Sequence, residues 1–394
     1  MIKLRKTFRL MLYLIVGTYM LSGCIEEYEA EVPAGDSDLL VIEGTICSNT
    51  VNKFYLSRTL PINSYEYPQI VGGAMLSVRG SDGSEYMADD YNGKYTCRVG
   101  ELNPDATYYL HIEIEGEVYE SEPQKPLRTE KIADVRGLQN TPEGCVDVLV
   151  TPASPFNPDQ INYYSWTYDE TWEVRPEYTT TMYFDVDTRK PVYQSNIYPV
   201  RGWKDDKGST IMVGSSTNYE GQQIQRLKMY DIDGNDERIF FRYSGLVHQR
   251  AISKAEYEYE TARRQAGSDM GGLFTPQPSA LPTNIHCLTS GKRAIGFVGC
   301  ALNTSDYRFF LEGENFTFYR PNIDTRIWLE DCNEDDCCRM VDRGYQLCVW
   351  EDSRENPKGY LTTAWATMKQ LDVRYRDAYI KEPDFWKLKA NVSY

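Results

Sequence analysis

The chain has 394 residues, enough for about two or three domains, and its 58 acidic residues outnumber its 42 basic ones, which gives a formal charge of −16 at pH 7. Removal of residues 1–23 as a signal peptide takes away four basic residues and no acidic one, so 38 basic side chains face 58 acidic ones in the mature chain. Nucleic acids and anionic lipids are therefore excluded as expected partners, because both bind basic surfaces.

The N-terminus has the features of a signal peptide. Basic residues open the chain, and the apolar run at 10–21 has the length of a signal-peptide core and is too short for a permanent membrane span. Leu21-Ser22-Gly23-Cys24 closes this run as a lipobox, the site where bacterial lipoproteins are cleaved and lipidated. The alternative is an ordinary cleaved signal with a chance cysteine. We expect Cys24 to be the lipidated first residue of the mature chain, with acyl chains as its only membrane anchor.

Residues 24–37 are predicted to be a lipidated acidic tether. Four glutamates follow Cys24 closely: Glu26, Glu27, Glu29 and Glu31. This cluster resembles the export signal of Bacteroidota surface lipoproteins, whereas a solvated tether without such a signal is also commonly acidic. The resemblance implies a lipoprotein of the outer membrane that is exposed at the cell surface.

Residues 38–130 have the pattern of an immunoglobulin- or fibronectin-like β-sandwich. Runs rich in Val, Ile, Tyr and Thr alternate with turn signals such as Asp82-Gly83 and Asn92-Gly93. Turn residues that recur about every 8–12 positions are typical of sandwiches. Strands are predicted at 39–46, 52–57, 73–79, 85–87, 107–114 and 117–121, and a hinge is predicted at 122–126.

Residues 131–394 are predicted to form a larger β-rich domain. A long strand is expected at 162–174, where Tyr164, Trp166 and Tyr168 share one face. These rings are interpreted either as part of a half-buried sheet or as an aromatic surface that faces a ligand. The sequence alone leaves both interpretations open.

One helix is predicted in the larger domain, at about 253–266. Ser253 and Glu256 form a capping box at its start, and the helix is expected to end near Gly267. Buried strands are predicted at 294–300 and 307–311. The fold class is therefore mainly β, with an N-terminal sandwich, a larger β-rich domain and one helix.

Nine cysteines remain after Cys24, and the densest group is Cys332, Cys337, Cys338 and Cys348. Cysteines of exported proteins favour disulfides, and the odd number leaves at least one thiol free or paired between chains. Zinc is less favoured, because adjacent cysteines are awkward ligands for one tetrahedron, and free thiols are the third interpretation. We expect disulfides in this group and no metal.

The sequence contains no recognised catalytic motif. There is no G-x-S-x-G, H-E-x-x-H, P-loop or dinucleotide fingerprint. The carboxylates at 231–237 do not have EF-hand spacing, so a charged turn is favoured over a calcium loop. His286 and Cys287 are neighbours in a strand-like segment and point to opposite faces, which disfavours a nucleophile–base pair. We expect no enzymatic activity and no cofactor.

Several segments together resemble the DUF4249 lipoproteins of Bacteroidota. They include the lipobox and tether, the strand at 40–46, and the late segment at 381–386. A helix–loop–strand signature is matched at Gly272, Phe274, Pro276, Pro278 and Asn284. The resemblance implies a structural role for these five residues and supplies no catalytic ones. The family has no assigned function, and its members are thought to accompany TonB-dependent outer-membrane receptors.

Three functional hypotheses follow. The first is a surface-exposed, non-enzymatic accessory or binding subunit of a TonB-dependent transport system. The second is a stand-alone glycan- or peptide-binding module that uses Tyr164, Trp166 and Tyr168; burial of these rings would argue against it. The third is a hydrolase with an unrecognised pair of carboxylates.

Overall fold

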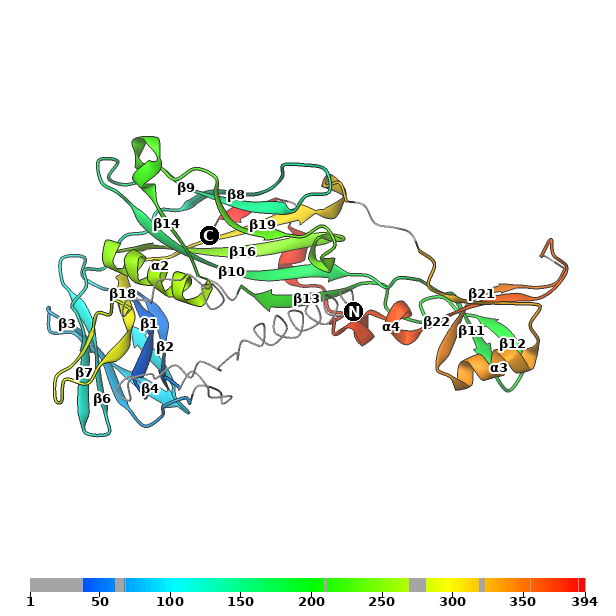
Figure 1. Cartoon of the computed structure of the whole chain (residues 1–394), viewed down its shortest axis with the longest axis horizontal. Coiled ribbons are helices and arrows are strands. Elements are labelled where there is room, and N and C mark those ends of the chain that lie inside the picture. The colour runs from blue at the N-terminus through cyan, green and yellow to red at the C-terminus, as the bar shows by residue number, and fades with distance from the viewer. Residues whose placement is uncertain are drawn as a thin grey trace, which may run out of the picture.

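A computed structural model describes residues 38–60, 67, 69–208, 211–268, 281–318, 323–354, 356–388 and 390–393, with the backbone alone for 266–268. These residues form three units along one long axis, each with its own hydrophobic core (Figure 1). A sandwich lies at one end, two stacked sheets in the middle, and a small unit at the other end. The prediction of a mainly β chain is confirmed.

The first unit is a β-sandwich whose strands run in the order β17-β7-β6-β3-β4-β5-β2-β1-β18. The period of two is clear in β2, where Phe54 and Leu56 are buried while Lys53 and Tyr55 are exposed. The predicted N-terminal sandwich is therefore confirmed. Its strands from the N-terminal region are β1 (Leu40–Cys47), β2 (Thr50–Arg58), β3 (Met75–Gly80), β4 (Glu85–Tyr91), β5 (Lys94–Val99), β6 (Tyr108–Ile114) and β7 (Glu117–Ser121).

Two strands of this sandwich come from much later in the chain. β18 (Ala294–Ala301) pairs in parallel with the whole of β1, and β17 (Ile285–Cys287) pairs antiparallel with β7. The side chain of Asn284 donates to the carbonyl of Val298 at 3.0 Å and accepts from its amide at 2.9 Å, so the two ends of the strand order meet and nearly close the sheet. Sequence order assigns these strands to the larger domain, whereas the structure places them in the first unit.

The predicted hinge at 122–126 is not a free linker. The amide of Glu122 donates to the carbonyl of Asn284, and Gln124 exchanges two backbone hydrogen bonds with Tyr108. Beyond it, Thr129 and Asn303 exchange three hydrogen bonds of 2.6–3.0 Å, which join the outgoing and returning connections between the units.

The middle unit consists of two sheets around one core. The larger sheet has the order β13-β10-β16-β19-β23, with β14 also paired to β10, and the smaller has the order β15-β9-β8. The strands of the larger sheet are β10 (Tyr163–Val174), β13 (Gly202–Lys207), β14 (Met212–Ser215), β16 (Arg242–Ile252), β19 (Ser305–Glu312) and β23 (Val392–Ser393). The strands of the smaller sheet are β8 (Ile132–Gln139), β9 (Val146–Pro152) and β15 (Leu227–Ile232).

Helix α2 (Lys254–Ser268) confirms the predicted helix and lies where the first two units meet (Figure 1). Ser253 Oγ accepts from the Glu256 amide at 3.1 Å, as the capping box requires. The Glu256 carboxylate instead binds the Arg250 guanidinium at 2.5 Å. The ring of Tyr259 packs 5.8 Å from that of Phe297 in β18, so the helix contacts both units.

The small unit combines the hairpin β11 (Met182–Asp185) and β12 (Lys190–Tyr193) with the sheet β20 (Ile327–Glu330), β22 (Thr362–Thr367) and β21 (Tyr345–Glu351). Helix α3 (Glu334–Asp342) covers its core, and α4 (Met368–Leu371) leads back to the middle unit. Helix α3 is not among the predicted elements. Its Asn333 and Asp336 form a complete capping box, a signal that was present in the sequence.

The prediction of disulfides among Cys332, Cys337, Cys338 and Cys348 was wrong. All nine cysteines that the structure describes are free thiols. Cys337 faces the core of the small unit, where burial raises its pKa to about 12, whereas Cys348 packs in a separate cluster with Ala366 and Leu371. Cys338 is the next residue on α3 and lies about 100° around the helix from Cys337, so the thiols point in different directions.

Candidate functional site

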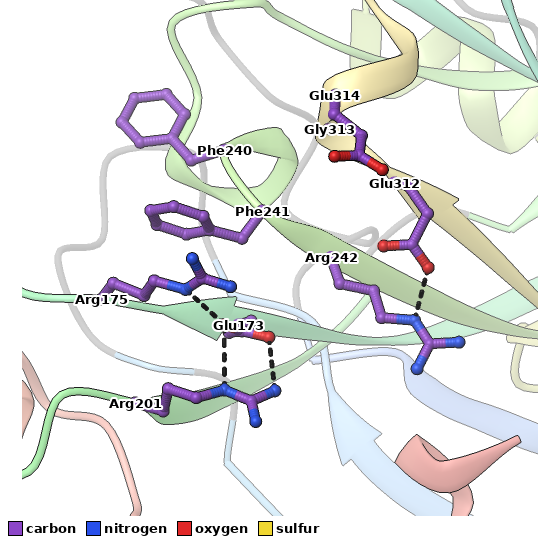
Figure 2. A pocket seen from close by; sticks show the side chains of 9 residues that line it. All are labelled: Glu173, Arg175, Arg201, Phe240, Phe241, Arg242, Glu312, Gly313 and Glu314. Atoms are coloured by element: carbon purple, nitrogen blue, oxygen red, sulfur yellow. Dashed lines mark hydrogen bonds and ion pairs between the residues drawn. The ribbon is translucent and has the colours of Figure 1, made fainter. Parts of the chain in front are cut away.

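A pocket of about 400 Å³ lies at one end of the larger sheet of the middle unit, where β10 and β19 end and β13 and β16 begin (Figure 2). Residues at the end of β10, before β13, before and within β16, and after β19 all reach it. We call it the arginine pocket; its lining residues are Glu173, Arg175, Arg201, Phe240, Phe241, Arg242, Glu312, Gly313 and Glu314.

One wall of the arginine pocket is built on a buried carboxylate. Glu173 is only 2 % exposed, yet two half-exposed arginines hold its oxygens. Arg175 Nε donates to Oε1 at 2.6 Å, and Arg201 donates to Oε1 at 3.1 Å and to Oε2 at 2.9 Å. Burial alone would raise the pKa of Glu173, but the hydrogen bonds and charges of Arg201 and Arg175 outweigh it and lower the pKa below 4.5. The three side chains therefore carry a net charge of +1.

The other wall is anchored by Arg242. Its Nε lies 2.8 Å from Glu312, and its two terminal nitrogens donate to the carbonyls of Trp386 at 2.5 Å and Leu388 at 2.7 Å. The guanidinium also lies 4.3 Å from the ring centre of Phe310. The two terminal nitrogens therefore tie the C-terminal segment to the sheet, whereas Nε pairs with the neighbouring strand β19.

Phenylalanines and a glycine complete the pocket. The Arg175 guanidinium lies 4.3 Å from the centre of the Phe241 ring, and this contact holds the guanidinium in place (Figure 2). Gly313 donates its amide to the carbonyl of Phe241 at 2.6 Å. A Cβ at Gly313 would come within 2.4 Å of the Ile239 carbonyl, so only glycine allows this close approach of two backbones.

The lining groups can recognise a ligand by charge and by hydrogen bonding. Among the residues that the structure describes, the lining consists of Glu, Arg, Phe and Gly and offers no hydroxyl, thiol or imidazole. A glycosidase needs one carboxyl group whose pKa is raised so that it can donate a proton. The pKa of Glu173 is lowered instead, and Glu312 is paired with Arg242.

The ion pairs of Glu173 predict a pH-dependent stability. We expect Glu173→Gln to lower the free energy of unfolding at pH 7 by about 1–2 kcal/mol, a value reduced for the solvent exposure of both arginines. Because the folded pKa of Glu173 lies below the unfolded value, its contribution is fully present above pH 4.5 and is lost as the pH falls through the folded pKa. Thermal unfolding of both proteins between pH 7 and pH 3 should show the gap closing; a constant gap would contradict the ion-pair account.

The sequence-predicted site residues fall into three groups. Cys24, the four tether glutamates and Gly272, Phe274, Pro276 and Pro278 lie outside the described residues. Asn284 has the expected structural role, because its side chain joins β17 to β18. The cysteines are free thiols, and the aromatic strand follows the sheet interpretation and not the ligand-facing one.

The aromatic residues of β10 do not face a ligand. Trp166 is 0 % exposed and Tyr164 is 2 % exposed. Trp166 Nε1 donates to Gln249 at 2.9 Å, and Tyr164 donates to the buried Glu130 at 2.8 Å. Tyr168 stacks on Tyr230 with ring centres 4.0 Å apart. The second sheet covers this face, which removes the observation behind a glycan- or peptide-binding platform there.

The arginine pocket is not among the sites predicted from the sequence. Arg175 and Arg201 are 26 positions apart and Arg242 is 41 positions further, so no local motif joins them. The one signal was Glu173 itself, a charged residue within a long aromatic strand. A buried strand that contains a carboxylate needs a cationic partner nearby in space.

Comparisons with known proteins identify a family and no function. A family model described as a domain of unknown function, DUF4249, matches residues 25–306. No curated protein matches the chain. Within the part of the chain that the structure describes, no helix has the length and apolar character needed to cross a bilayer.

Proposed function

Because this chain belongs to the DUF4249 family, whose function is unknown, we propose its role from its own residues. It is a lipoprotein of the outer membrane, exposed at the cell surface, that acts without enzymatic activity as an accessory or binding subunit of a TonB-dependent transport system. The observation that carries this proposal is the lipobox Leu21-Ser22-Gly23-Cys24, followed by the glutamate-rich tether.

The arrangement of the units supports a tethered binding role. β1 begins at Leu40, shortly after the tether, and runs away from that end of the sandwich beside β18. The middle unit is attached at the opposite end, where Leu127 bonds to Cys300 and Leu302. The chain therefore enters the sandwich at the end opposite to the middle unit, an arrangement that suits contact of the middle and small units with a receptor.

The arginine pocket supports binding rather than catalysis. Its most buried carboxylate is held by two guanidinium groups, and its described lining residues include no nucleophile other than carboxylates. Arg242 ties the C-terminal segment to the same wall, so the pocket is held by elements from the whole middle unit. A rigid, charged pocket on a tethered protein is suited to holding a ligand for a neighbouring transporter.

Isolation from native outer membranes tests this role. We expect the tagged full-length chain, extracted in a gentle detergent, to carry a TonB-dependent receptor in a fixed ratio that mass spectrometry can identify. A Cys24→Ala variant should lose the lipid and leave the membrane fraction, which provides the matched control. Recovery of the lipidated protein without any receptor would overturn the accessory role.

A further inference from the structure

We propose that the arginine pocket binds a small ligand that carries one carboxylate group together with hydroxyl or ammonium donors. This inference deepens the proposed binding role and rests on it. The proposal rests on two observations: one wall has guanidinium donors that the described residues do not use, and the other wall has carboxylate acceptors (Figure 2).

The cationic wall is prepared for an anion. Glu173 uses Arg175 Nε and, on Arg201, Nε and Nη2. Among the described residues, the terminal nitrogens of Arg175 have no hydrogen-bond partner, and Arg201 Nη1 has only Glu382 at 3.7 Å. The arginine side chains are 48 % and 44 % exposed, so these donors can be reached from solvent. A planar guanidinium whose position is already fixed binds a carboxylate with little further loss of entropy.

The acidic wall limits the ligand to a single negative charge. Glu312 is 44 % exposed beside Arg242, and Glu314 is exposed and forms no ion pair with the described residues. These carboxylates would repel a second anionic group and accept hydrogen bonds from hydroxyl or ammonium groups. Phe240 and Phe241 add an apolar surface between the two walls. Phosphate-rich ligands are therefore disfavoured, whereas a sugar acid or an amino acid fits the arrangement.

Titration of the full-length lipoprotein in detergent tests this pocket. Calorimetry with glucuronate and with alanine separates a sugar acid from an amino acid, and glucose is the neutral control. We expect saturable binding of glucuronate or alanine, and binding of glucose at least about tenfold weaker, because glucose lacks the carboxylate that forms charge-assisted hydrogen bonds. Absence of saturable binding by both acids would overturn the proposal.

Two variants locate the binding site. Arg175→Gln should weaken binding of the acid at least about tenfold while Arg201 still holds Glu173, and Arg264→Gln, on the exposed side of α2, should leave binding unchanged. Glu314→Gln changes an exposed side chain and should also weaken binding, because the carboxylate accepts from the ligand's hydroxyl or ammonium group. Unchanged affinity in both Arg175→Gln and Glu314→Gln would overturn the proposal. Receptor association is measured separately, so its loss and a loss of ligand binding are distinguishable.

Discussion

A fragment that contains only residues 38–130 is expected to remain unfolded, although it includes β1 to β7. The missing β17 and β18 supply Ile285, Val298 and Cys300 to the core of the sandwich. Without β18, the backbone of β1 loses its parallel partner along all eight residues, and Leu40 and Ile42 lose the strand that lies beside them. An apolar strand left unpaired at a sheet edge also promotes aggregation.

The control for this prediction restores the missing strands. The same fragment, joined through a Gly/Ser linker to residues 281–303, should regain dispersed amide resonances and a cooperative thermal transition. Limited proteolysis should degrade the short fragment and spare the joined one. A cooperative transition of the short fragment alone would show that β17 and β18 are accessory to this unit.

The sequence predicted strands better than it predicted their partners. The strand at 294–300 was identified from its apolar run, and β18 (Ala294–Ala301) matches it closely. Its assignment to the larger domain followed from sequence order. Pairing of β18 with β1 joins residues more than 250 positions apart, and a local pattern contains no information on such contacts.

The same limit applies to the candidate sites. Alternation showed correctly that Tyr164 and Trp166 share a face, but it cannot show whether a second sheet covers that face. The cysteine-rich segment was interpreted through redox chemistry, and its capping residues Asn333 and Asp336 were overlooked. Arg175, Arg201 and Arg242 meet only because antiparallel pairing brings the ends of three strands together.

Replacement of Glu170 by alanine is expected to lower the stability of the middle unit by about 3–5 kcal/mol. Glu170 is 4 % exposed and lies in the second half of β10. Its carboxylate accepts from Arg238 Nη1 at 2.9 and 3.0 Å and from the Tyr243 hydroxyl at 2.6 Å. In the variant, the buried Tyr243 hydroxyl keeps only its hydrogen bond with the Tyr230 hydroxyl, at 2.7 Å. The Arg238 guanidinium loses one of its ion-pair partners.

The expected loss of stability is large because Glu170 and Tyr243 are buried. A buried charge that loses its partner keeps its desolvation cost, whereas replacement of both partners by apolar groups removes that cost. Glu170→Ala should therefore lower the midpoint of thermal unfolding by roughly 10 °C. Glu170→Leu combined with Arg238→Met should recover much of this loss. A Glu170→Ala variant within about 1 kcal/mol of the wild-type protein would show that solvent or Asp236, which also binds Arg238, compensates the charge.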